Sequence, residues 1–113
     1  MPLYTAVDLT ATIAANGSLS SAVHLNSRLP CRIDMPAAWD EAPLTFQVST
    51  DGVNYADLYD QCGNEYTVTA AAGRAIVLTP SDFFGANYIK VRSGPAETAV
   101  PQTAARTLTI VAI

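Results

Sequence analysis

The chain has few charged side chains. Lysine, arginine, aspartate and glutamate make up 14% of its 113 residues, against about 25% in ordinary soluble domains. The formal net charge is −4, and the six basic residues are scattered. A nucleic-acid-binding surface needs a basic patch or stripe that neutralises phosphates, so we expect no direct contact with nucleic acid. Because so few charges solubilise a surface poorly, we expect another protein to cover part of it.

Long apolar runs and a recognisable leader are also missing. Half of the residues are hydrophobic, yet no run approaches the roughly 18 to 20 apolar residues of a membrane helix. The first residues, MPLYTAVDLTATIAANG, contain no basic segment and no unbroken apolar block, so we expect no export signal and no membrane partner. The length predicts a single domain over residues 1–113 that has its own hydrophobic core.

Residues for metal binding and catalysis are scarce. Cys31 and Cys62 have no CxxC spacing, and with the single His24 they cannot complete a tetrahedral zinc site. The chain contains no GxSxG, HExxH or glycine-rich phosphate-binding motif. We therefore expect no enzymatic activity, no cofactor and no required metal. A disulfide between the two cysteines stays open as an alternative, although nothing indicates an oxidising compartment.

What the chain does have is alternation of apolar and polar residues, which is typical of strands with one buried face. No window carries a helical stripe, and Gly, Pro and Asn separate the alternating segments. The pattern predicts an all-β fold, a small antiparallel β-sandwich or jelly-roll-like barrel of about eight short strands. Residues 93–106, SGPAETAVPQTAAR, are expected to form a long surface loop before the last strand. The candidate strands are 7–13, 19–25, 31–35, 44–48, 66–70, 76–78, 88–91 and 107–113.

The segment VSTDGVNYADLYD, residues 48–60, predicts a hairpin. Asp-Gly at 51–52 between two apolar runs favours a two-residue type I′ turn, which places Val48 opposite Tyr55. A bulge near Ala56 or Asp57 is then needed to turn the following leucine to the core. A calcium loop is the competing interpretation, but oxygen donors at spacing three do not match the EF-hand pattern. Those donors are Asp51, Asn54, Asp57 and Asp60.

Aromatic and unused apolar residues supply the candidate interface. Most aromatic side chains are expected in the core, including one of Phe83 and Phe84. Trp39 lies in a predicted loop and is the best candidate for an exposed anchor, since aromatic residues concentrate binding energy at interfaces. A plug at the end of the sandwich is the equal alternative for Trp39. The other interface candidates are Pro2, Leu3, Tyr4, Val100 and Pro101, which the alternating core pattern does not use.

Two resemblances add to these interpretations. LTFQVSTDGVNYADLYD is similar to a strand–turn–strand signature of many β-sandwich modules, including discoidin-type domains. RIDMPAAWDEAPLTFQVSTDG, EYTV, AIVLTPSDFFGANYIKVRSG and AARTLTIVAI together resemble small structural proteins of tailed bacteriophages. The second resemblance implies a non-enzymatic β-sandwich of the virion.

The function implied by the phage resemblance is decoration and stabilisation of the capsid as a minor capsid protein. Its partner would be the lattice of the major capsid protein, and its location the virion after synthesis in the host cytoplasm. The low charge favours a homo-oligomer, and a trimer suits the three-fold positions of a capsid. The alternative is a carbohydrate-binding β-sandwich, either free or associated with a phage tail.

Overall fold

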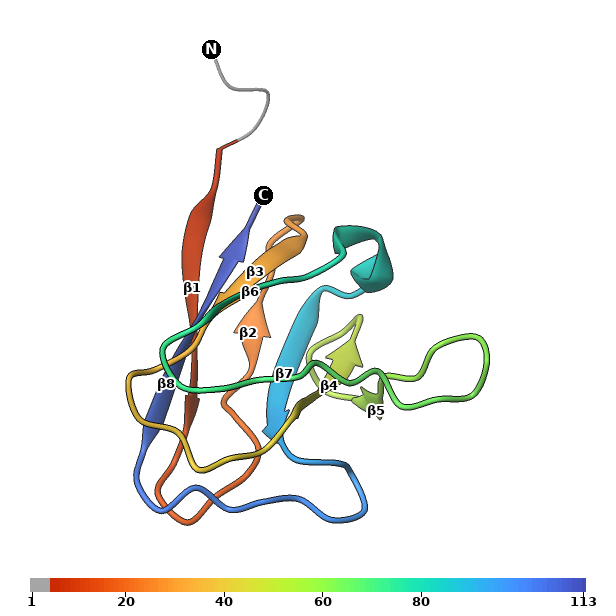
Figure 1. Ribbon diagram of the computed structural model, residues 1–113. Helices are drawn as coiled ribbons and strands as arrows, with labels where there is room; N and C mark the ends of the chain where they lie inside the picture. Colours follow the sequence, from red (N-terminus) through yellow and green to blue (C-terminus); the bar gives the residue numbers. More distant parts are fainter. Residues whose placement is uncertain (1–4) are drawn as a thin grey trace.

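The computed structural model describes residues 5–113, which form a sandwich of two four-stranded antiparallel sheets (Figure 1). This confirms the all-β prediction and decides for a sandwich over a closed barrel. The only helical segment in residues 5–113 is the 3₁₀ turn η1 (Pro80–Phe83), and no helix there has the length and hydropathy to cross a membrane. The strands are β1 (Val7–Ile13), β2 (Val23–His24), β3 (Pro30–Asp34), β4 (Leu44–Ser49), β5 (Ala56–Asp57), β6 (Ala75–Val77), β7 (Tyr88–Ser93) and β8 (Arg106–Ala112).

The last two strands of the chain occupy central positions. Sheet A has the order β1-β8-β3-β6, and sheet B has the order β2-β7-β4-β5. β8 therefore pairs on both sides, with β1 and β3, and β7 pairs with β2 and β4. Neither sheet is complete until the C-terminal third of the chain is in place, a topology dominated by pairings distant in sequence.

The inner faces of the two sheets follow the predicted alternation. Ile89 and Val91 of β7 are fully buried, while Tyr88 and Lys90, which alternate with them, are only partly buried. Phe46 on β4 is also fully buried, and its ring contacts two other aromatic rings edge to face, with centroids 5.5 and 5.7 Å apart. The larger members of this core are Ile13, Leu25, Ile33, Leu44, Phe46, Phe83, Ile89, Leu108 and Ile110.

The hairpin after β4 turns more widely than predicted. β4 and β5 pair Val48 with Ala56, one residue beyond the predicted partner Tyr55. The pairing continues without a bulge, and Leu58 still packs against the core. The extra residue therefore lies in the turn, so the predicted bulge is not needed.

The carboxylate of Asp51 explains the wider turn. Its Oδ1 accepts hydrogen bonds from the backbone N–H groups of Val53 and Asn54, both at 2.8 Å, and from the Ser49 hydroxyl at 3.0 Å. A type I′ turn requires a positive φ at both of its central residues. Gly52 has a φ of +78°, but Asp51 is not among the residues with positive φ. A side chain that bonds to the backbone two and three residues ahead favours an Asx-type loop over the tighter turn.

Two predicted strands are shorter than expected. Of residues 19–25, only Val23–His24 form a regular strand. The hydroxyl of Ser20 accepts the hydrogen bond of the Val91 N–H at 2.9 Å, so a side chain replaces a backbone acceptor and interrupts the ladder. Residues 66–70 contribute only an isolated bridge, at Val68.

The long segment between β7 and β8 is attached to the base of the sandwich by Gln102. Its side chain is fully buried and donates from Nε2 to Ser93 Oγ at 2.8 Å and to the Asp40 carbonyl at 3.0 Å. Gln102 Oε1 accepts from the Asp40 N–H at 2.8 Å. This polar contact closes one end of the core without leaving the amide unsatisfied.

Replacement of Phe46 by alanine is expected to lower the free energy of unfolding by about 3–5 kcal/mol, because it leaves a cavity among buried rings. Urea denaturation followed by circular dichroism measures the change. Val77→Ala is the control, since Val77 is 82% exposed and its truncation should change stability by less than about 0.5 kcal/mol. Equal losses in the two variants would contradict the position of Phe46 in the core.

Candidate functional site

A short arm projects from the outer edge of sheet B beyond β5. We call residues 58–66 the arm; Figure 1 shows it extending away from the body of the sandwich. The chain folds back on itself through hydrogen bonds from Tyr66 N to Leu58 O at 2.9 Å and from Asp60 N to Asn64 O at 2.8 Å. The Asp60 carboxylate accepts from the N–H groups of Cys62 and Asn64, both at 2.9 Å, and so shapes the exposed tip.

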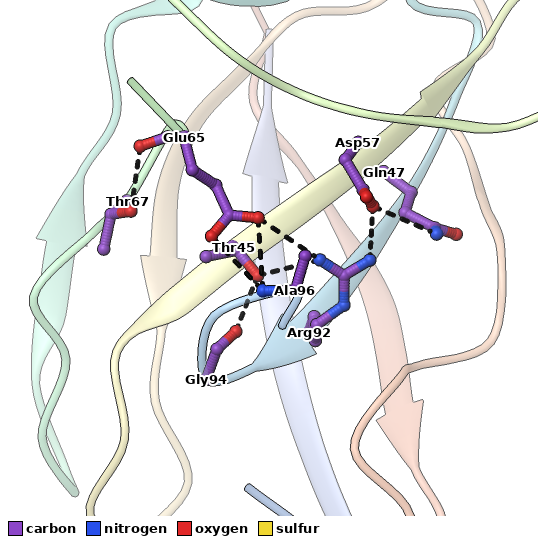
Figure 2. Close-up of polar contacts among 8 residues, drawn as sticks. All are labelled: Thr45, Gln47, Asp57, Glu65, Thr67, Arg92, Gly94 and Ala96. Carbon is purple, nitrogen blue, oxygen red and sulfur yellow. Dashed lines mark hydrogen bonds and ion pairs between the residues drawn. The ribbon is translucent and has the colours of Figure 1, made fainter. Parts of the chain in front are cut away.

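Both ends of the arm are joined to sheet B by one arginine (Figure 2). Arg92 on β7 has a side chain that is only 8% exposed. Its Nη2 forms an ion pair with the Asp57 carboxylate just before the arm, and its Nη1 lies 3.6 Å from a carboxylate oxygen of Glu65 near the arm's end. Nη1 also donates to Thr45 Oγ1 at 3.4 Å. Arg92 therefore fixes where the arm leaves and rejoins the body.

The charges of this cluster compensate one another. A buried guanidinium is costly unless carboxylates and hydrogen-bond acceptors surround it. The hydrogen bond from Arg92 lowers the pKa of Asp57, which stays ionised as its partner. Glu65 also accepts from the Ala96 N–H, at 3.2 Å, which links the arm to the loop before β8. Because its donors are engaged within the protein, Arg92 has a structural role rather than that of an anion-binding residue.

Two hollows lie beside the arm and share Leu58 and Asp82 in their walls. The first, of about 340 Å³, lies between the Asp51 turn and the segment just after η1, and Phe84 lines it. The second, of about 790 Å³, lies along the arm and is lined by Tyr59 and Tyr66. Both volumes fall in the range of small-molecule sites.

The ionisable groups between the hollows are suited to hydrogen bonding. Burial, together with the neighbouring Asp82 carboxylate, raises the pKa of Tyr66 to about 12. Tyr66 is therefore a neutral phenol at ordinary pH and does not act as a base. Asp82 lines both hollows and lies near this phenol, so a carboxylate that can accept hydrogen bonds stands at the point where the hollows meet.

The acidic residues considered for calcium have separate tasks. Asp51 shapes its turn, Asp57 pairs with Arg92, and Asp60 shapes the tip of the arm. Within residues 5–113, no group of three or more histidine, cysteine, aspartate or glutamate side chains is placed to hold a metal ion. Cys31 and Cys62 are both free thiols, so the disulfide left open by the sequence is not formed.

The candidate interface residues are only partly brought together. Trp39 is half-buried against the core, and its indole Nε1 donates to the Ala42 carbonyl at 3.1 Å, the arrangement of a plug rather than of an exposed anchor. The loop that carries Trp39 meets the segment before β8 through the bonds of Asp40 to Gln102. In that segment Val100 is half-buried and Pro101 is exposed. Pro2, Leu3 and Tyr4 lie outside the described residues.

The exposed aromatic residues at the hollows were not identified from the sequence. Phe83 is buried in the core and Phe84 is 72% exposed. The adjacent pair was the available signal, because one of two consecutive aromatic residues faces away from the core. Tyr59 carries no comparable signal, since its exposure depends on how the arm folds.

Comparisons with protein-family models, curated proteins and solved structures found no match for this chain.

Arg92→Met is expected to destabilise the protein by about 2–3 kcal/mol, because it leaves two carboxylates facing each other without their buried cation. Urea denaturation measures the loss. The matched control is Arg32→Met, which breaks the exposed pair between Arg32 and Asp34 at 2.9 Å and should leave the denaturation midpoint nearly unchanged. Similar midpoints for both variants would contradict the structural role of Arg92.

Stability should fall as the pH drops below about 4, the ordinary pKa of aspartate. The folded protein holds the pKa of Asp57 below that value through Arg92, so the unfolded chain binds the proton first. Asp57→Asn is expected to reduce the fall without abolishing it. Backbone N–H groups, from Thr103 and Asn54 respectively, are the main cause of the lowered pKa values of Asp40 and Asp51.

Urea denaturation of the wild type and of Asp57→Asn between pH 7 and pH 2 tests this expectation. Parallel pH dependences for the two proteins would show that Asp57 is not linked to folding in this way.

Proposed function

We propose that this protein is a non-enzymatic component of a tailed-phage virion that decorates and stabilises the capsid as a minor capsid protein. The observation that carries the proposal is the outer face of sheet A. Neighbouring β1 and β8 place threonines opposite one another there, Thr10 with Thr109 and Thr12 with Thr107. Val77 on β6 adds an aliphatic side chain that is 82% exposed. The face also carries three charged residues, Asp8 and the pair of Arg32 and Asp34, but its threonines and Val77 offer uncharged surface that suits contact with another protein.

The few charges of the chain are partly used internally, which strengthens the case for a covered surface. Arg92 and Arg106 are largely buried and pair with carboxylates, Arg106 with Asp40 at 2.8 Å. On the outer face of sheet A, Arg32 and Asp34 pair with each other. The number of charged side chains free to interact with water or to repel another protein is therefore even smaller than the composition suggests.

The edges of sheet A offer a second means of contact. β1 and β6 are its edge strands, and edge strands present backbone groups to which another chain can add. β1 follows the N-terminal segment that the sequence suggested as an interface. Assembly as a homo-oligomer, with a trimer favoured, would cover these edges and match the three-fold positions of a capsid lattice.

The phage proposal also draws on the resemblance of several segments to small virion proteins. That resemblance suggests an ordered protein lattice as the partner, and the uncharged part of the sheet face is compatible with such a contact. Nothing about the proposal requires a metal, a cofactor or a catalytic group.

The test is co-sedimentation with expanded shells assembled from a major capsid protein encoded in the same genome. We expect the protein to pellet with the shells and to be a trimer by light scattering. Val77→Asp should weaken shell binding about tenfold or more, since it adds a second carboxylate beside the exposed pair of Arg32 and Asp34, and the contact would have to desolvate it. The control Val53→Asp changes a valine that is 79% exposed in the Asp51 turn and should bind as the wild type does. A monomer that stays in the supernatant would overturn the proposal.

A further inference from the structure

The two hollows beside the arm contain the most exposed aromatic surface of the molecule. Among residues 5–113, four large hydrophobic side chains are exposed, and two of them are aromatic. Phe84, 72% exposed, lines the first hollow, and Tyr59, 51% exposed, lines the second. Exposed aromatic rings beside a hollow indicate a binding surface more strongly than scattered apolar residues do.

The backbone holds Phe84 in this position. Phe83 closes η1 and is buried, and the chain then becomes extended at Phe84, with φ −59° and ψ 133°. Gly85 follows with a φ of +86°, and the Ala86 N–H bonds back to the Phe83 carbonyl at 3.1 Å. The ring of Phe84 is therefore presented by a short, hydrogen-bonded turn that is anchored in the core.

Tyr59 is positioned by the arm. Tyr59 and Glu65 form a bridge across the arm, and Glu65 lies beside the buried Arg92. The arm forms one wall of the second hollow, and the ion pairs shown in Figure 2 hold the two ends of the arm against sheet B. A ligand would meet preformed walls and would not have to order the arm on binding.

The polar groups of the hollows select against anions. Asp82 lines both hollows, and Asp60 and Glu65 line the second. No lysine, arginine or histidine is among the residues that line either hollow within residues 5–113. Phosphate, sulfate or carboxylate groups on a ligand would meet these carboxylates without a cation in either lining. A lysine does lie close to the first hollow: Lys90 Nζ is 4.4 Å from the centroid of the Tyr55 ring, and Tyr55 is one of the lining residues.

Neutral polyhydroxyl compounds fit this combination. Their hydroxyl groups donate strong hydrogen bonds to carboxylates, and the polarised C–H bonds on one face of a sugar ring pack against the negative face of an aromatic ring. Asn54 and Gln61 add amide groups to the two walls. Two adjoining hollows, each with its own exposed ring, suit consecutive units of a saccharide chain.

We propose that the hollows lined by Phe84 and Tyr59, which meet at Asp82, form a binding site for a neutral saccharide. This gives a location to the carbohydrate-binding alternative that the sequence left open. The site lies at the arm and η1, whereas the proposed capsid contact lies on the outer face of sheet A, so saccharide binding neither needs nor replaces the capsid role.

The first test applies the labelled full-length protein to an array of neutral and acidic oligosaccharides. We expect binding to at least one class of neutral glycan, and weaker binding to sialylated or sulfated forms of the same glycan. Absence of binding to every neutral glycan, or preference for the acidic forms, would overturn the proposal.

The second test titrates the best neutral oligosaccharide against variants. Phe84→Ala and Tyr59→Ala should each bind about tenfold more weakly or worse, the effect expected for loss of one stacked ring. Phe84→Tyr keeps a flat ring and should retain most of the affinity. Val77→Ala truncates another exposed side chain, on sheet A, and should bind as the wild type does. All these positions are exposed, and thermal denaturation confirms that each variant is folded.

Two results of the second test would overturn the proposal. One is unchanged affinity in the Phe84→Ala and Tyr59→Ala variants. The other is that these variants keep their saccharide affinity but lose self-association or shell binding. That result would show that the two rings contact protein and not saccharide. Shell co-sedimentation of Val77→Asp is measured separately, so failure of the capsid proposal and failure of this one remain distinguishable.

Discussion

The burial of Arg92 between two carboxylates is the interaction on which the unusual part of this molecule depends. A plain two-sheet sandwich needs only its apolar core, but the arm leaves β5 and contributes few core side chains. Arg92 ties its first end through Asp57 and its second through Glu65. A buried guanidinium that loses its water is costly unless carboxylates replace that water. Any arrangement that moved Asp57 or Glu65 away from Arg92 would therefore be destabilised, and this gives the arm one defined position. The walls of the larger hollow follow from that position.

The scarcity of charge gives this ion-pair cluster a second consequence. Ordinary domains keep most charged groups in water, where they maintain solubility. Here Arg92 and Arg106 are withdrawn into contacts with carboxylates, and alanine and threonine are the commonest exposed residues in residues 5–113. The outer face of sheet A, with its threonines on β1 and β8, is a regular example of such a surface.

The two proposed binding surfaces are separated by the fold itself. One belongs to the outer face of sheet A, and the other lies at the edge of sheet B beside the arm and η1 (Figure 1). The two proposed surfaces therefore share no residues, and each can be tested without altering the other.

The sequence by itself determined the fold class and most strand positions, because a strand with one buried face requires alternation of apolar and polar residues. For the candidate site, the only signal in the sequence was the adjacent pair of Phe83 and Phe84. The tertiary structure decided the rest, since the deciding partners are distant in the chain. Arg92 and Asp57 are 35 residues apart, and Gln102 and Asp40 are 62 apart. The hairpin register also depended on side-chain hydrogen bonds of Asp51, which an Asp-Gly pair does not reveal. Local patterns record which face of a strand is buried, but not which buried or exposed groups meet across the folded chain.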